Sequence, residues 1–212
     1  LREPEHDTEK ASIAKFFKDQ LEGFRQLNKT NQIRSQTILL VGTGLFMVMA
    51  SQVLNDALGV EIGFEPYQFG LIAAGMYLLA SLSSQLVPII NVKITGIGIL
   101  VLSTLFISIT FIVSPLLGFV TGALALSIRW SMQSIFDGAT SIIVNQNIES
   151  KFRATTISTL TLIKNIPYAF AAYFLGSVME NANVRSFNLW VGLSLLAVLT
   201  VTYIHERSTR TS

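Results

Sequence analysis

Long runs of apolar residues, separated by short polar turns, follow a charged N-terminal segment in this sequence. A hydrocarbon core about 30 Å thick is crossed by a helix of about 20 mainly apolar residues. Runs of about that length or longer cover residues 36–58, 67–90, 94–113, 116–148, 154–179 and 187–204. The pattern therefore predicts an all-α, polytopic membrane protein with six transmembrane helices in residues 36–205, followed by a polar tail at 206–212.

Residues 1–35 are predicted to form a cytoplasmic linker that contains one amphipathic helix. Apolar side chains recur there at spacings of three and four residues, and charged residues fill the other face. The apolar positions are Ile13, Phe16, Phe17, Leu21, Phe24 and Leu27. Two placements fit this pattern: the helix lies on the membrane surface or packs against cytoplasmic loops. A soluble linker helix would show the same pattern.

The composition supports a membrane protein and excludes several kinds of chemistry. Hydrophobic residues make up 50% of the chain, charged residues 13%, and the mean hydropathy is +0.54. Cysteine is absent and both histidines, His6 and His205, lie in polar flanks, so no disulfide, thiolate metal site or histidine dyad is expected at membrane depth. We expect neither a cofactor nor enzymatic activity, and a net charge of +2 gives no indication of nucleic-acid binding.

The basic residues predict the orientation in the cell membrane, because cytoplasmic loops carry the excess of lysine and arginine. With six spans, one side holds Arg2, Lys10, Lys15, Lys18, Arg25, Lys29, Arg34, Lys93, Lys151, Arg153, Arg207 and Arg210. The other side holds only Arg185. Both termini of this segment are therefore predicted to be cytoplasmic. Charged residues follow Leu1 directly and no signal peptide is visible, so we expect a further part of the protein upstream.

Two turns resemble a known family. The sequence NQNIESKFRATTISTLTLIKNIPYAFAAYFLG contains Asn145 or Asn147, then Arg153, Ala154, Thr155 and Ser158. This order is similar to the turn after the tenth helix in bacterial transporters of the major facilitator superfamily. The stretch LGVEIGFEPYQFGLIAAGMYLLASLSSQL, with Gly70, resembles an earlier turn of the same family. The chain departs from the pattern by lacking a proline in the first of these turns and by keeping only Lys93 of a basic run.

The resemblance implies the C-terminal half of such a transporter. The six helices would then form two inverted three-helix repeats, with the first and fourth spans lining a central cavity. A missing N-terminal six-helix half would supply the other wall. Transport of a small-molecule substrate would proceed by rocking of the two halves, and this chain alone is not expected to transport.

Charged residues inside the predicted spans are the candidate functional residues, because an ionisable group at membrane depth is costly and usually has a partner. Asp137 and Lys164 lie equally far from the predicted cytoplasmic boundaries at Ile148 and Arg153, each about 16 Å deep at about 1.5 Å per residue. We therefore predict that they pair. Such a pair either fixes helix packing or responds to a proton or a charged substrate.

Arg129 lies further out on the same predicted helix, at the depth of Asn55 and Asp56 on the first span, which predicts an encounter between Arg129 and Asp56. Gln133 falls between Arg129 and Asp137, within a sector of about 80°, so we expect this stripe to face a cavity. Further candidates for hydrogen bonds to a substrate or between helices are Gln52, Asn55, Gln85, Asn165 and Tyr168.

These features predict a secondary transporter that exports a small organic compound in exchange for protons. The export direction rests on resemblance to bacterial drug-efflux proteins. Uptake of a sugar or organic acid is the alternative, and a non-transporting membrane scaffold is a third interpretation. An intramembrane protease is disfavoured, because the serine in GLSL, residues 192–195, has no histidine base at membrane depth.

Overall fold

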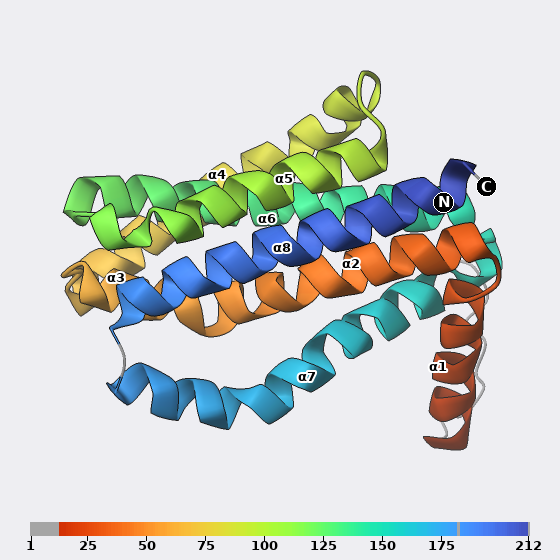
Figure 1. The fold of residues 1–212 in the computed structure, drawn as a ribbon, viewed down its shortest axis with the longest axis horizontal. Helices are drawn as coiled ribbons and strands as arrows, with labels where there is room; N and C mark the ends of the chain where they lie inside the picture. Colours follow the sequence, from red (N-terminus) through yellow and green to blue (C-terminus); the bar gives the residue numbers. More distant parts are fainter. Residues whose placement is uncertain (1–12, 182, 212) are drawn as a thin grey trace, which may run out of the picture.

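The computed structural model describes residues 13–181 and 183–211, and within these segments the chain is helical and contains no strand. The helices are α1 (Ile13–Leu27), α2 (Asn31–Met49), α3 (Asn55–Glu61), α4 (Pro66–Asn91), α5 (Gly96–Ile112), α6 (Phe119–Asn147), α7 (Arg153–Asn181) and α8 (Val184–Thr211) (Figure 1). Short turns of π or 3₁₀ helix lie at η1 (Ala50–Leu54), η2 (Ser114–Leu116) and η3 (Ser150–Phe152). The all-α prediction is confirmed.

The helices begin where side chains can accept the free N–H groups of a first turn. Thr30 precedes α2 and its hydroxyl accepts from the N–H of Ile33, while Thr95 accepts in the same way from Gly98 before α5. Pro66 occupies the first position of α4, where a missing N–H does no harm. Helices α2, α4 and α5 therefore begin near residues 36, 67 and 94, where the apolar runs are predicted to begin.

Three helices are long and apolar enough to cross a membrane, and they span Asn31–Glu61, Tyr67–Asn91 and Val184–Thr209. The helix Gly96–Ile112 is apolar but shorter. Large apolar side chains such as Leu71 and Val92 are exposed on the protein surface, as expected where lipid or another protein covers it. The finer arrangement of six spans in two inverted repeats stays a prediction.

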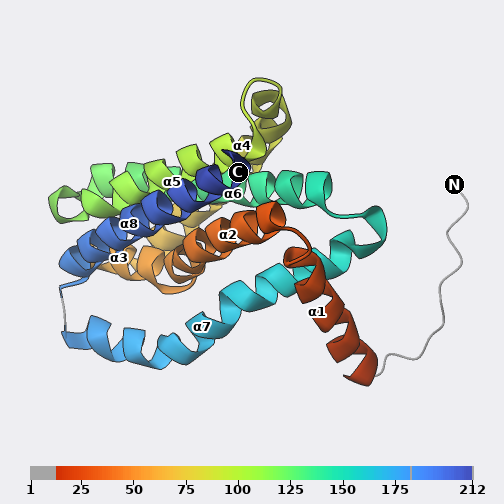
Figure 2. The same cartoon turned by 45° about the vertical axis from the view of Figure 1, so that its right-hand side comes forward.

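The helices pack into a bundle from which part of α7 diverges (Figures 1 and 2). Helix α6 packs against α4 and α5, and α8 packs against α5 and α2. Between them lies an apolar core that includes Leu39, Leu100, Phe136 and Leu195. Helix α7 contacts α2 and α1, contains Pro167, and changes direction along its length (Figure 1). A proline inside a helix removes one hydrogen bond and commonly produces such a bend.

Helix α1 runs across the end of the bundle rather than along it (Figure 1). It packs against α7, and its buried side contains Gly23, Gln26 and Leu27. Of the predicted apolar stripe, the residues exposed on the surface are Phe16, Phe17, Leu21 and Phe24. Among the side chains that the structure describes from Phe16 onward, the helix therefore meets the protein through one large apolar residue, Leu27, together with Gly23 and Gln26. Arg2 and Lys10, two of the basic residues that predict the orientation in the membrane, lie outside the described residues.

Candidate functional site

The predicted pair of Asp137 and Lys164 is confirmed, with Lys164 Nζ 4.0 Å from Asp137 Oδ1. Asp137 comes from α6 and Lys164 from α7, so the contact joins two helices that are consecutive in the chain. The Lys164 side chain is only 12% exposed, whereas that of Asp137 is 62% exposed. The Lys164 side chain is thus largely buried, whereas the Asp137 side chain lies largely at the protein surface.

A cavity of about 350 Å³ contains this pair. Its walls come from α2, α6 and α7, and its polar lining includes Gln133, Thr140 and Asn165 beside the two charged residues. Met47, Val48 and Leu160 supply apolar wall. Cavities that bind small molecules commonly combine apolar walls with a few polar groups and begin at about this size.

Gly44 on α2 makes room for Lys164. A Cβ atom at residue 44 would collide with the aliphatic part of the Lys164 side chain. Beyond this crossing point, Lys164 Nζ lies 5.8 Å from the centre of the Phe136 ring, which is within the range of a cation–π interaction. The direction of Lys164 toward α6 therefore depends on a glycine that the sequence analysis had not connected with it.

The stripe predicted on α6 is divided in two by the structure. Gln133 and Asp137 line the cavity, but Arg129 is completely buried elsewhere, at 1% exposure. All five N–H groups of its guanidinium donate hydrogen bonds. The acceptors are Thr110 Oγ1 (3.1 Å), Asn55 Oδ1 (3.3 Å), Asn188 Oδ1 (3.1 Å), the Thr110 carbonyl (3.0 Å) and Ser114 Oγ (2.8 Å).

The predicted encounter between Arg129 and Asp56 is therefore wrong by one residue. Asn55 provides the acceptor, whereas Asp56 is exposed on the outside of α3. Because successive residues of a helix point about 100° apart, only one of the two can face α6. The Phe111 ring lies 3.8 Å from the guanidinium carbon and covers one face of the charge. With its donors all used, Arg129 has no hydrogen-bonding capacity left for a substrate.

Sequence reasoning missed Thr110, Ser114 and Asn188 as partners of Arg129. They come from α5, η2 and α8. The sequence feature that could have identified them is that all three are polar residues near the predicted outer ends of apolar runs, at the depth of Arg129. Gln52 is also placed apart from the pair, since it is exposed on η1. Of the residues proposed for the pathway, the structure brings together Gln133, Asp137 and Lys164 around one cavity and puts Asn55 in the Arg129 network.

The turn motif contacts the linker helix. Arg153 Nε donates to the carbonyl of Ile148 at 3.1 Å, which closes the turn between α6 and α7. Ser158 Oγ accepts from Gln20 Nε2 at 3.4 Å, and Thr159 Oγ1 donates to Gln20 Oε1 at 2.9 Å. The carbonyl of Thr155, also 2.9 Å away, is the alternative acceptor for the single hydroxyl proton of Thr159. Asn145 is exposed and Asn147 bonds within α6.

An exposed ion pair completes the contact between the linker and this turn. Lys29 Nζ lies 2.8 Å from Glu149 Oε1, just before η3. The hydrogen bond and the positive charge of Lys29, with a smaller contribution from the charge of Lys151, hold the pKa of the Glu149 carboxyl below its usual value. The turn that resembles the transporter motif thus serves, in this chain, as the docking site of α1.

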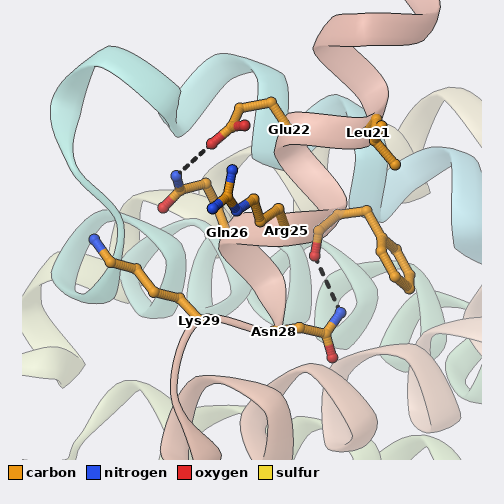
Figure 3. Close-up of a pocket in the computed structure, with 7 residues that line it drawn as sticks. Leu21, Glu22, Arg25, Gln26, Asn28 and Lys29 are labelled. Carbon is orange, nitrogen blue, oxygen red and sulfur yellow. Dashed lines mark hydrogen bonds between the residues drawn. The ribbon is translucent and has the colours of Figure 1, made fainter.

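A second, larger hollow of about 790 Å³ lies on α1 itself (Figure 3). Glu22, Arg25 and Gln26 project to one side of the helix and Leu21 and Asn28 to the other. Glu22 accepts a hydrogen bond from Gln26 at 2.8 Å. One helix and the turn after it supply all the lining residues, so this is an open surface depression, and it shares no residue with the cavity around Asp137.

Within the described part of the chain, no cluster of three or more histidine, cysteine, aspartate or glutamate side chains could hold a metal ion. Comparison with protein-family models, with curated proteins and with solved structures finds no match to this chain. The cavity and its charged pair are therefore the features of the molecule that bear on its function.

Proposed function

We propose that this chain is the C-terminal half of a secondary active transporter of the major facilitator type, and that Asp137 and Lys164 form its charge-sensing pair. The observation that carries the proposal is the position of the pair, inside a cavity walled by α2, α6 and α7. A charged pair retained in an apolar helix bundle has a cost, which a transport role would justify.

The geometry of the pair supports exchange of partners. At 4.0 Å the contact exceeds the usual length of a charge-assisted hydrogen bond, about 2.7–2.9 Å. A cationic group of a substrate would compete with Lys164 for Asp137, and an anionic group would compete with Asp137 for Lys164. A proton on Asp137 would release the lysine in the same way. Each event changes the charge between α6 and α7, which gives a physical link between binding and helix movement.

The exposed carboxylate of Asp137 fits a site whose second wall is supplied by another part of the protein. Asp137 is open to the outside of the described helices, and α7 diverges from the bundle on the same side of the molecule as α1 (Figures 1 and 2). In the proposed arrangement the missing N-terminal half covers this opening, and six helices of this chain cross the membrane. Export of a small organic compound against proton entry is the direction that we propose.

The test uses the intact parent protein in membrane vesicles with an imposed inward proton gradient. Proton movement is recorded after adding lipophilic cations, sugars or organic acids, for the wild type and for Asp137→Asn. Asp56→Asn is the matched control, because Asp56 is an exposed acid outside the cavity. We expect one substrate class to trigger proton flux, which Asp137→Asn abolishes and Asp56→Asn preserves.

Other outcomes would change the assignment. Substrate movement with protons rather than against them would replace export by uptake. Flux that persists in a folded Asp137→Asn variant would reduce the pair to a packing element. The absence of flux with every compound would favour a membrane scaffold.

A further inference from the structure

An apolar groove of about 380 Å³ lies where the linker helix meets the bundle. Phe24 of α1, Ile38 and Val41 of α2, and Ile163 of α7 form its apolar walls, and Thr202 of α8 also lines it. Phe24 and Ile38 are both exposed, at 52% and 42%. The groove is therefore open and would bury apolar surface if an apolar group filled it.

The polar residues of the groove gather at one end. Arg34 lies one helical turn before Ile38 on α2, and Val41 lies about 10 Å from Arg34 along the axis at about 1.5 Å per residue. Asn28, in the turn between α1 and α2, also lines this part. An amphiphile with its polar group at Arg34 would thus place its apolar part along Ile38 and Val41.

Arg34 is suited to an anionic group. It is exposed, and its Nη2 donates a hydrogen bond to Asn31 Oδ1 at 3.1 Å, so other N–H groups of the guanidinium remain available among the described residues. No acidic side chain belongs to the described lining of the groove. The guanidinium geometry matches the oxygens of a phosphate, to which it donates parallel hydrogen bonds.

The position of the groove identifies the source of such an amphiphile. Helix α2 begins the membrane-spanning candidate Asn31–Glu61, and α1 lies across the end of the bundle at this point (Figure 1). Arg34 is in the first turn of that candidate, at the level where lipid headgroups are expected, and Ile38 and Val41 are deeper. A soluble anion bound at Arg34 would leave the apolar walls of the groove exposed to water. An apolar helix in the groove would leave the Arg34 guanidinium without an acceptor for its hydrogen bonds.

We propose that this groove binds one anionic phospholipid of the membrane leaflet at the α1 end, with its phosphate at Arg34 and an acyl chain between Phe24, Ile38 and Ile163. The bound lipid would connect α1, α2 and α7. The proposal requires that α2 crosses the membrane, and it does not depend on transport activity.

The experiment is native mass spectrometry of the intact protein in detergent, with added phosphatidylglycerol or phosphatidylcholine. Both lipids carry the phosphate, but the choline cation of phosphatidylcholine is repelled by Arg34 and cancels the net charge of the headgroup, so we expect phosphatidylglycerol to be retained about tenfold more strongly. Arg34→Gln should remove this preference. Lys93→Gln is the control, because Lys93 is an exposed cation in the turn between α4 and α5, outside the groove.

A second variant tests the acyl-chain part of the site. Ile38→Trp fills the open groove, so it should lower retention of both lipids without changing the thermal unfolding temperature. The proposal is overturned if both lipids are retained equally by the wild type, if Lys93→Gln and Arg34→Gln have the same effect, or if Ile38→Trp leaves retention unchanged. Displacement of phosphatidylglycerol by glycerol phosphate alone would also overturn it, since the site would then bind a soluble anion.

Discussion

The side chain of Lys164 crosses α2 at Gly44, in the space that a Cβ atom of residue 44 would occupy. This close approach directs the ammonium group toward Asp137 and into the cavity. Two residues far apart in the sequence thus determine whether the charged pair can form. A glycine that would otherwise be assigned to general helix packing becomes part of the candidate site.

Gly44→Ala should displace Lys164 and weaken its contact with Asp137. The added methyl group would overlap the Lys164 side chain, which is flexible and can move away from it at little cost in stability. We therefore expect an unfolding temperature in detergent close to that of the wild type, but reduced substrate-triggered proton flux. Gly75→Ala is the matched control, because a Cβ at residue 75 meets nothing within 4 Å. Unchanged flux in Gly44→Ala would show that the direction of Lys164 is unimportant.

A double-mutant cycle on Asp137→Asn and Lys164→Gln should give a coupling energy of about 0.5–1 kcal/mol. The value is small because the contact is 4.0 Å long and the Asp137 side chain is more than half exposed. Reversible unfolding of the four proteins in mixed micelles gives the coupling. A value of several kcal/mol would indicate a tightly fixed structural pair and would count against exchange with a substrate.

Arg129→Met should destabilise the protein by about 3 kcal/mol or more, because several buried acceptors lose their donor together. Arg129→Lys should recover little of this lost stability, since an ammonium group offers three donors and lacks the planar fork that reaches all five acceptors. The measurement is thermal unfolding followed by size-exclusion chromatography. Lys93→Gln, an exposed change, is expected to stay within about 0.5 kcal/mol of the wild type.

Helix α1 should detach from α7 in Gly23→Leu. A Cβ at residue 23 would overlap the Thr159 side chain and approach the Thr155 carbonyl. Since the chain contains no cysteine, Gln20→Cys and Ser158→Cys can be joined by a short thiol cross-linker without background. We expect Gly23→Leu to reduce the cross-linking yield several-fold, as a loss of about 1–3 kcal/mol from overpacking implies. An unchanged yield would mean that α1 docks by other contacts.

Acid pH should loosen the same contact through Glu149. Lys29 lowers the pKa of this carboxyl in the folded protein, so the stabilising contribution is present at neutral pH and is lost as the pH falls through that lowered pKa. The distance between spin labels attached at neutral pH to Gln20→Cys and Ser158→Cys should therefore increase below about pH 4, near the ordinary glutamate pKa. Glu149→Gln should remove this pH dependence, whereas Glu65→Gln, an exposed change in the turn before α4, should preserve it.

The sequence was sufficient for the local features of this protein. Apolar runs predicted the helices, because the pattern of apolar residues acts over a few residues. Equal distances from the helix ends also predicted the contact of Asp137 with Lys164, since consecutive antiparallel helices share a turn that sets their relative depth. The same arithmetic reached the correct turn for Arg129 but selected Asp56 instead of Asn55, because the rotation of one helix about its axis is set by packing.

Only the tertiary structure decided which polar residues act together. The partners of Arg129 come from α3, α5, η2 and α8, and no sequence spacing relates them. It also separated Arg129, with all five donors used, from Gln133 and Asp137, which line a cavity, although the three share one face of α6. The reason is physical: periodicity determines which face a residue occupies, whereas burial and hydrogen bonding depend on what the other helices place opposite that face.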